Sequence, residues 1–548
     1  MVALPVTLPP APPPWRRRFR AVAAGFAAAF PYLAAALFAT ALTLVTMRHE
    51  MWRDEIQAWL LARDSASLPA LFLNLRYEGH PGLWHLLLWP LAHLTWNPAA
   101  MQGLHIALAT ASAFLVLRFA PFPRIIRLSL VFGYLFFYEW GVIARNYAVS
   151  VLILFAFCAL FPQRRRLFPV LALLLAVLCH ANVHSVILVI ALGGYLALEH
   201  VTANWGRLRT PEAHSRRFLA GSLILAIGIT TAILQLKPPA DANFANGWNS
   251  HWNTQDAKRC TETVINGWLP LPENSPYYWN SNQIRNQLPA FSGKRTIWQE
   301  ARVRVAVGIL AFALLFFLSR PLFMLPFLAG TVGLELFFYI KYPGSLRHHG
   351  FLFLWFVVLL WLSACGPRRL LPWRIPEAVL NGWHRFRFWL LLPLLALQVW
   401  GAWIAARQDW NVPFSNGPAA AARIRREVEG DRLQVLAGES SPEISTVVGY
   451  ARLPRVYYLD RESPGSFIVW DNARTQNRPR LTQRLRTILQ QDPRDALLLT
   501  SGPLNPKRMD GLDLTILETF KTPSVSGENY YLYRLRNPYA PATLPPAP

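Results

Sequence analysis

The stretch AVAAGFAAAFPYLAAALFATALTLVTMRHEMWRDE, residues Ala21–Glu55, decides the fold. Its first part, Ala21–Met47, carries no charge and exceeds the roughly 20 apolar residues that a membrane span needs. It follows Arg16–Arg18 and is longer than the apolar part of a cleavable signal peptide, about 7–15 residues, which predicts an uncleaved anchor. Because the basic residues precede the span, the N-terminus is predicted to be cytoplasmic and Asp54 and Glu55 to lie on the far side.

The charge of the chain follows the same logic. The sequence has 548 residues, 53% of them hydrophobic, and a net charge of +24. Most arginines stand in short segments between apolar runs, as in Arg164–Arg166, which is the positive-inside pattern of a membrane protein. No helix-turn-helix or basic-aromatic RNA module is present, so we expect membrane lipids rather than nucleic acid as partners of the basic residues.

Apolar runs separated by basic turns predict about eleven spans. Besides 21–47 they are 99–118, 128–143, 147–161, 167–181, 184–200, 218–236, 303–318, 321–340, 350–364 and 388–406. Gly82–Trp96 is apolar as well, but it is short and contains His85, Pro90 and His93. As a span it would invert every later basic loop, so it is predicted to lie along the membrane surface.

These boundaries predict a mainly α, polytopic membrane helix bundle with a small C-terminal periplasmic α/β domain, in a bacterial inner membrane. The predicted parts are a disordered basic cytoplasmic tail (1–20), a transmembrane domain (21–406) with periplasmic loops 48–98 and 237–301, and a periplasmic domain (407–548). In that last part helices alternate with predicted strands, which is typical of an α/β domain. The strands are Leu433–Ala437, Val456–Leu459, Phe467–Trp470 and Ala496–Thr500, and Ser415–Pro418 predicts the start of a helix.

Met51–Glu55 carries the clearest chemical signal. Two acids where a helix leaves the bilayer can simply be a solvated helix end. Here, however, Tyr77–Pro81 follows, with a His-Pro turn before the predicted surface helix. A glycosyl transfer needs one carboxylate to take a proton from the incoming nucleophile. The second carboxylate can hold a metal ion or a sugar hydroxyl.

These motifs resemble those of the GT-C glycosyltransferases, which include the protein O-mannosyltransferases and the aminoarabinose transferase of lipid A. Such enzymes carry an Asp/Glu pair just after the first span and then a His-Pro-Pro-Leu-like turn before a juxtamembrane helix. The corresponding residues here are Asp54-Glu55 and His80-Pro81-Gly82-Leu83, with glycine in place of the second proline.

Ala144–Tyr147 resembles the arginine-containing segment of the second periplasmic loop in these families. Many members have an acid directly after that arginine, whereas this chain has Asn146, and its nearest acid is Glu139. The sequence therefore departs from a two-acid metal site, and a divalent metal ion remains open as a cofactor.

The resemblance implies transfer of a sugar from a polyprenyl-phosphate-linked donor to a lipid, glycan or protein acceptor. Asp54 is the expected base, assisted by Glu55. An arginine suits the donor because its guanidinium pairs with phosphate in a two-pronged geometry. The predicted catalytic residues are Asp54 and Glu55, and the predicted substrate-binding residues are His80, Arg145, Tyr147, Arg347, His348 and His349.

Simpler explanations stay open for several of these residues. Arg145 is equally explained as an interfacial arginine that reaches toward headgroups. His180 and His184 would share a face of a continuous helix, a spacing that suits a metal ion, but without a nearby acid polar packing at a helix end explains them better. The predicted periplasmic loop 237–301 is rich in tryptophan. The side chains of this tryptophan-rich loop either stack on sugar rings or lie at the membrane interface. A non-catalytic carrier or assembly factor for lipid-linked glycans is the alternative function, although polar residues in transporters gather at mid-membrane.

Overall fold

The computed structural model describes residues 14–539 apart from 206–215, 246, 250, 294, 366–376, 429–432, 439–440, 473–480, 493, 506–508 and 510. The helices up to residue 236 are α1 (Pro14–Thr46), α2 (Arg53–Asp64), α3 (Leu68–Asn74), α4 (Leu83–Leu94), α5 (Ala99–Phe119), α6 (Arg124–Val131), α7 (Tyr147–Leu160), α8 (Phe168–Cys179), α9 (Val183–Ala203) and α10 (Arg216–Leu236). The later helices are α11 (Thr254–Trp268), α12 (Gln283–Gln287), α13 (Ala301–Leu315), α14 (Met324–Ile340), α15 (Leu346–Cys365), α16 (Glu377–Leu390), α17 (Leu392–Asn411), α18 (Gly417–Val428), α19 (Ser441–Ala451) and α20 (Leu481–Gln491).

The described residues also form short segments of other helix types. Four of these are 3₁₀ turns: η1 (Leu75–Tyr77), η3 (Phe161–Gln163), η6 (Ile297–Gln299) and η7 (Pro321–Phe323). The fifth, η2 (Tyr134–Val142), is a π-helix. The strands are β1 (Leu433–Ala437), β2 (Val456–Tyr458), β3 (Ser463–Gly465), β4 (Asp495–Thr500), β5 (Leu514–Phe520) and β6 (Tyr530–Leu535).

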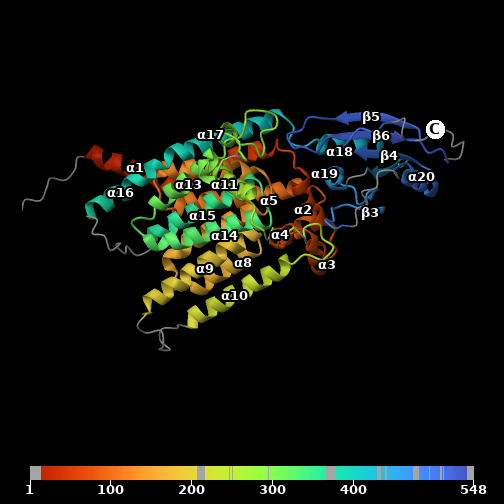
Figure 1. Cartoon of the computed structure of the whole chain (residues 1–548). Helices are drawn as coiled ribbons and strands as arrows, with labels where there is room; N and C mark the ends of the chain where they lie inside the picture. Colours follow the sequence, from red (N-terminus) through yellow and green to blue (C-terminus); the bar gives the residue numbers. More distant parts are fainter. Residues whose placement is uncertain are drawn as a thin grey trace, which may run out of the picture.

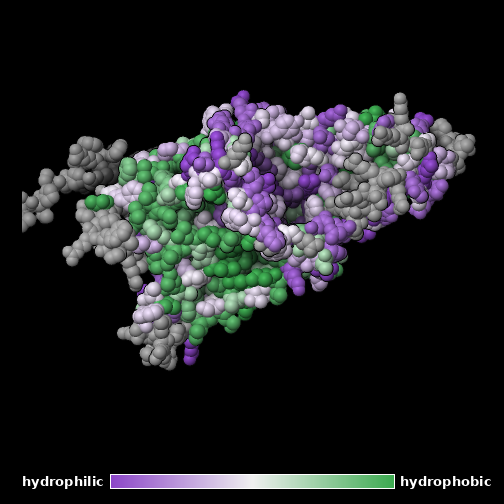
Figure 2. Space-filling view, viewed as in Figure 1, coloured by the Kyte–Doolittle hydropathy of each residue, from purple (hydrophilic) through white to green (hydrophobic). Residues whose placement is uncertain are grey.

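Each predicted span coincides with helical structure. Within the described residues, eight helical segments are long and apolar enough to cross a membrane. The spans predicted at 147–161, 167–181 and 303–318 form shorter helices, namely α7 with 14 residues, α8 with 12 and α13 with 15. The predicted fold class, a mainly α membrane bundle with a small C-terminal α/β domain, is confirmed. Apolar side chains cover the surface around α8–α10, as a lipid-facing surface requires (Figure 2).

One predicted boundary differs from the structure, and one predicted loop contains a helix. Helix α1 begins at Pro14, so the end of the predicted disordered tail is helical, while residues 1–13 lie outside the described part. The predicted loop 237–301 contains α11, which packs against α15 and α13 and buries Val264, Ile265 and Trp268. This helix carries apolar residues on one face only, so a search for long apolar runs does not find it.

The short helices α2, α3 and α4 lie between the bundle and the C-terminal domain (Figure 1). Helix α4 has 12 residues, too few to span a bilayer, and it packs against α2. Helix α19 of the C-terminal domain packs against α2 from the other side. Gly449 lies in this contact, where an added Cβ would be 2.4 Å from Ile56 Cγ2. Helix α2 is therefore enclosed between the membrane part and the C-terminal domain.

The C-terminal domain contains one mixed sheet with the strand order β3-β2-β1-β4-β6-β5. Strand β1 is parallel to β2 and β4, and the remaining pairs are antiparallel. The predicted strands at 433–437 and 496–500 are confirmed, and that at 456–459 ends one residue early. Phe467–Trp470 is not a strand, and β3, β5 and β6 were not predicted. Ser415 caps the predicted helix, since its Oγ accepts a hydrogen bond from Gly417 N at 2.9 Å.

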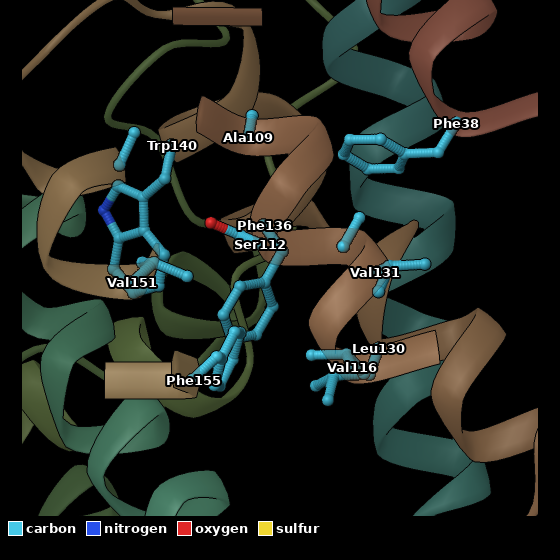
Figure 3. Close-up of a pocket in the computed structure, with 12 residues that line it drawn as sticks. Phe38, Ala109, Ser112, Val116, Leu130, Val131, Phe136, Trp140, Val151 and Phe155 are labelled. Carbon is cyan, nitrogen blue, oxygen red and sulfur yellow. The ribbon is translucent and has the colours of Figure 1, made fainter. Parts of the chain in front are cut away.

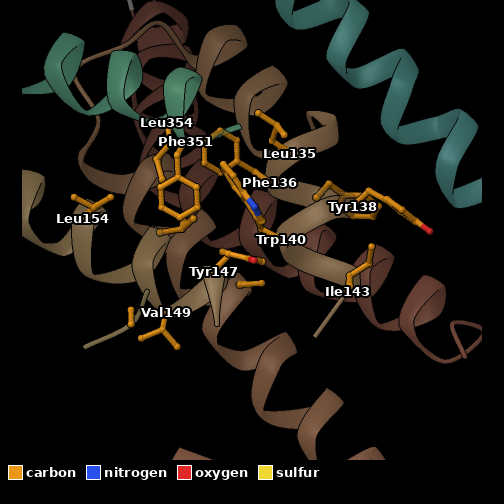
Figure 4. Close-up of a cluster of buried hydrophobic side chains, with 14 of the residues drawn as sticks. Leu135, Phe136, Tyr138, Trp140, Ile143, Tyr147, Val149, Leu154, Phe351 and Leu354 are labelled. Atoms are coloured by element: carbon orange, nitrogen blue, oxygen red, sulfur yellow. The ribbon is translucent and has the colours of Figure 1, made fainter. Parts of the chain in front are cut away.

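The bundle core is built around η2. All nine residues of this π-helix are buried, and Trp140 packs edge-on against Phe136 and Phe351 (Figure 4). A small apolar cavity lies beside it, lined by Phe38, Trp140 and Phe155 among others (Figure 3). The aromatic packing fixes the end of η2 that leads to Arg145.

Candidate functional site

Asp54 lies in the first turn of α2, where arginines from two distant segments reach it. Asp54 Oδ2 is 2.9 Å from Arg145 Nη1 and 3.3 Å from Arg347 Nη2. Arg53 Nε is 3.8 Å from Asp54 Oδ1. The Asp54 side chain is 21% exposed, so a bound molecule has access to it. The structure thus brings together three predicted site residues that are far apart in the sequence.

Opposing effects set the pKa of Asp54. Burial raises it, but the positive charges of Arg145, Arg347 and Arg53 together prevail, so the pKa lies below its ordinary value. The carboxylate is therefore ionised at neutral pH, and its charge is shared between two guanidinium groups.

Arg145 follows the π-helix η2. In this helix type an N–H bonds to the carbonyl five residues earlier, as Ile143 N does to Tyr138 O at 3.3 Å. Such turns are rare and often occur at functional sites. His105 of α5 holds the segment in place: Nδ1–H donates to Gly141 O at 2.9 Å and Nε2 accepts from Arg145 N at 3.3 Å.

Arg347 lies in the first turn of α15, against two aromatic rings. Its guanidinium carbon is 5.6 Å from the Trp52 ring centroid and 5.4 Å from that of Trp279. Its backbone oxygen accepts a hydrogen bond from Trp140 Nε1 at 3.2 Å. Cation–π contacts of this kind restrict a long side chain to one direction. Trp279 belongs to the tryptophan-rich loop, and nothing in the sequence indicated that it would lie beside Arg347.

Glu55 has a different environment from its neighbour. Its side chain is 0% exposed. Oε1 accepts a hydrogen bond from Ala144 N at 2.6 Å, and Oε2 accepts one from Trp52 N at 3.1 Å. Oε2 is also 3.1 Å from His49 Nε2. With both oxygens occupied and no surface exposed, Glu55 joins α2 to the segment that carries Arg145.

A buried charge network continues from Glu55 and was not predicted. His49 Nδ1 is 2.9 Å from Asp409 Oδ2 in α17, and Tyr138 OH donates to the same oxygen at 3.0 Å. Burial lowers the pKa of His49, but the charges of Asp409 and Glu55 outweigh it and hold the pKa well above its ordinary value. The imidazolium is therefore the counterion of two buried carboxylates. Because Asp409 is 360 residues away in the sequence, no local motif could have indicated this.

The His-Pro turn places two titratable groups near Asp54. Burial lowers the pKa of His80 to about 3, so its imidazole is neutral, and its buried Nδ1 has no hydrogen-bond partner. Burial raises the pKa of Glu78 to about 7. Glu78 Oε1 accepts from Gln57 Nε2 at 2.7 Å. His80 is thus a predicted residue with an unused polar atom, as is Arg347 through its Nε, and Glu78 is a titratable neighbour that was not predicted.

Tyr147 and His348 form a buried pair behind Arg145 and Arg347. Tyr147 OH is 2.8 Å from His348 Nε2. The other ring nitrogen, Nδ1, accepts from the backbone N–H of Ser345 at 2.9 Å. Because an N–H only donates, Nδ1 carries no proton, so Nε2–H donates to the Tyr147 oxygen. The Arg145 guanidinium lies 6.0 Å from the Tyr147 ring centroid.

His349 lies at a different pocket from Asp54, and His180 and His184 do not share a helix. His349 Nε2 donates to Pro343 O at 2.8 Å, on the side of a different pocket. His180 and His184 are not on one helix, because α8 ends at Cys179 and Asn182 caps α9 by accepting from Ser185 N at 2.9 Å. The shared helical face expected for this pair is therefore absent.

The C-terminal domain caps α2. Arg53 N, the first amide of α2, donates to Glu528 Oε1 at 2.6 Å. Met51 N donates to Tyr450 OH at 2.6 Å. Further along, both atoms of the Gln57 amide bond to the backbone of Ile468, each at 2.8 Å. A chain segment almost 500 residues away thus satisfies the free amides at the start of the Asp54 helix.

The oxygens of Asp54 and Glu55 already have partners in the structure. Among the described residues, no group of three or more His, Cys, Asp or Glu side chains lies together as a metal site would require. The Asp54 oxygens face arginines, and the Glu55 oxygens face backbone amides and a histidine. Cations and N–H donors in these places take up the oxygens that a metal ion would need.

No protein-family model matches the chain, and no curated protein matches it. The chain is similar to the solved structure of ArnT from Cupriavidus metallidurans bound to undecaprenyl phosphate, with 12% identity and a TM-score of 0.49. The likeness covers 95% of this chain and 100% of that one. ArnT is an aminoarabinose transferase of the GT-C type, the group that the sequence motifs resemble. This degree of similarity does not assign a donor or an acceptor to the chain.

Proposed function

We propose that the chain is an inner-membrane glycosyltransferase that moves a hexose or pentose from a polyprenyl-phosphate-linked donor to an acceptor on the periplasmic face. The observation that supports this most directly is the partly exposed Asp54 carboxylate held between Arg145 and Arg347. One group that accepts a proton and two that bind a phosphate are what such a transfer needs.

The proposed reaction is a single displacement. Asp54 takes the proton of the acceptor hydroxyl as its oxygen attacks the anomeric carbon of the sugar. The bond between that carbon and the phosphate oxygen breaks, and the electron pair leaves with the polyprenyl phosphate. Arg145 and Arg347 stabilise the negative charge that develops on this leaving group. Attack opposite the leaving group inverts the configuration at the anomeric carbon.

Binding of the donor should also change the pKa of Asp54, because the donor phosphate competes for the arginines that pair with this carboxylate. With the arginines beside it, Asp54 has a low pKa and is a weak base. A donor phosphate that pairs with Arg145 and Arg347 draws their charge away from Asp54 and adds a negative charge nearby. Both changes raise the pKa of Asp54. Donor binding thereby makes Asp54 a stronger base.

The other predicted residues support these groups. Glu55, Tyr147 and His348 are buried, so we assign them to positioning: Glu55 holds the Arg145 segment, and His348 holds Tyr147 behind Arg145. His80 is placed to donate to or accept from the substrate through its unused Nδ1. His349 lines a different pocket, so we do not assign it to binding of the donor.

The test uses full-length protein in lipid nanodiscs with a panel of polyprenyl-phosphate sugars. Release of the polyprenyl phosphate is measured together with the sugar transferred. We expect turnover by the wild type and a loss of about 100- to 10,000-fold in Asp54→Asn, the usual range for removing a general base. Asp54→Asn should still bind the donor, because both arginines remain.

Asp492→Asn is the matched control, since Asp492 is a carboxylate of the C-terminal domain that pairs with Arg494. It should leave turnover unchanged. A wild type that binds the lipid donor without releasing sugar from any member of the panel would instead identify a carrier. Full activity of Asp54→Asn would remove the proposed base.

A further inference from the structure

A second pocket, separate from the Asp54 site, lies where α11 meets the end of α14. It has a volume of about 380 Å³, within the range of small-molecule sites. The residues that line it come from α11 and other parts of the loop 237–301, from the end of α14 and the turn after it, and from the first turn of α15. Those used below are Asn249, Asp256, Arg259, Asn266, Lys341 and His349.

The pocket presents both donors and acceptors at close spacing. Asn249 Nδ2 is 3.4 Å from Asp256 Oδ2, and Arg259 Nη1 is 3.3 Å from Asp256 Oδ1. Deeper in, Asn266 Nδ2 donates to His349 Nδ1 at 3.3 Å. Each hydroxyl of a sugar donates one hydrogen bond and accepts others, so a lining of amides, carboxylates and guanidinium groups matches it.

An aromatic ring lies next to the same pocket. Trp248 is not itself a lining residue, but it lies between Gly247 and Asn249, which both line the pocket, and it is 64% exposed. The ammonium of Lys341, another lining residue, is 4.7 Å from the Trp248 ring centroid. Lys341 Nζ also donates to Phe244 O at 2.6 Å, which fixes it in place. The indole is thus held beside the polar lining with much of its surface open.

The lining mixes acids with cations: Asp256 and Glu262 lie there together with Arg259, Arg285 and Lys341. Asp256 pairs with Arg259, and Glu262 pairs with Arg302, so part of the positive charge is already neutralised. A polyhydroxyl compound needs no net charge in the lining and gains from the exposed ring, because tryptophan offers a large apolar surface next to a polar edge.

The pocket adjoins the Asp54 site through one turn. Pro343 and Gly344 line the pocket, and the turn they form leads directly into Arg347 and His348. An added Cβ at Gly344 would be 3.2 Å from His348 Cβ and 3.2 Å from His349 Nε2. A ligand in this pocket therefore lies one turn of chain away from the residues that hold Asp54.

From these observations we infer that the pocket binds a saccharide: Trp248 stacks on the sugar ring, and Asn249, Asp256 and Asn266 bind its hydroxyls. The identification of this saccharide as part of the acceptor rests on the proposed function. The saccharide site itself does not depend on it.

The experiment measures binding of soluble oligosaccharides to full-length protein in nanodiscs by saturation-transfer NMR and calorimetry. The panel carries terminal hexose, hexosamine and uronic acid residues. We expect at least one member to bind, and Trp248→Ala to weaken binding about tenfold, as loss of a stacking surface would. Asp256→Asn should also weaken it, and Trp248→Phe should restore part of the affinity.

Trp298→Ala is the matched control, because Trp298 is 67% exposed on the same loop region and, unlike Trp248, has no chain neighbour that lines the pocket. It should bind like the wild type, and so should Asp54→Asn. Saccharide binding without transfer by the wild type would leave the pocket assignment standing and reject the proposed function.

Two results would overturn the saccharide site. The first is that no saccharide binds, or that binding is equal in wild type, Trp248→Ala and Asp256→Asn at unchanged melting temperature. The second is that a photoreactive phospholipid in the nanodisc labels Trp248 and its neighbours, which would make this surface part of the membrane interface.

Discussion

Asp54 and Glu55 are neighbours in the sequence but differ in what surrounds them. Successive side chains of an α-helix point about 100° apart, so α2 directs one carboxylate toward the arginines and the other into the protein. Asp54 is partly exposed and Glu55 is 0% exposed. The Asp-Glu pair predicted a site from the sequence, whereas the division of roles depends on which way the helix faces.

Replacing Glu55 by glutamine should lower the stability of the fold. Glu55→Gln leaves one oxygen where Trp52 N, Ala144 N and His49 need two, so a buried donor loses its acceptor. Such a loss costs about 1–3 kcal/mol. Asp54→Asn changes a group with access to water and should cost less. Thermal unfolding of the purified variants should give the lower apparent melting temperature for Glu55→Gln, and equal values would contradict the assignment of Glu55 to positioning.

At the scale of elements, the membrane spans were predictable because long apolar runs are a property of the sequence itself. The contacts that complete the site were not. Arg347 was predicted from its position at a span end, but the rings that hold it, Trp52 and Trp279, come from a helix start and a distant loop. The π-helix before Arg145 is set by how aromatic side chains pack, and it has no sequence pattern of its own.

The turn before α15 contains a glycine, Gly344, in a left-handed conformation. Gly344 has a φ of +74°, a conformation that costs other residues about 1–2 kcal/mol. In Gly344→Ala the new methyl group would also press on His348 and His349. Since this turn leads into Arg347, we expect weaker donor binding and reduced turnover, measured by lipid-donor titration and by release of polyprenyl phosphate.

Gly308→Ala in α13 is the control for this change. An added Cβ at Gly308 meets no atom within 4 Å. Alanine also favours a helix over glycine by about 1 kcal/mol. The control should therefore bind the donor normally and be equally or more stable. Normal donor binding by Gly344→Ala would show that the turn does not position Arg347.

The C-terminal domain contacts the helix that carries Asp54 through Glu528. This carboxylate accepts hydrogen bonds from Arg53 N at 2.6 Å and from Thr446 Oγ1 at 3.1 Å, and it also bonds to Ser415. Glu528→Ala removes the cap of α2, a loss of about 1 kcal/mol for a typical cap. We expect faster amide hydrogen exchange in the first turn of α2 and reduced turnover.

Glu528→Gln removes the negative charge of Glu528 but keeps the hydrogen-bond acceptor at the start of α2. A glutamine keeps an oxygen for Arg53 N and offers an N–H to Ser415 Oγ, so it should retain most activity. Burial raises the pKa of Glu528 to about 7 from its ordinary 4.5. The folded protein therefore holds a proton that the unfolded chain releases, and this group lowers stability as the pH rises from about 4.5 to 7. That part of the pH dependence should vanish in Glu528→Gln, and its persistence would assign it to another group.

The bond between Arg53 and Glu528 joins residues 475 positions apart, and this separation affects the order of events during synthesis. The helix that carries Asp54 leaves the ribosome 475 residues before its partner. Until Glu528 has been made, the nascent protein contains Asp54, Arg145 and Arg347 but not the carboxylate that completes the start of that helix. The Asp54 site should therefore become ordered only in polypeptides that have been synthesised as far as β6.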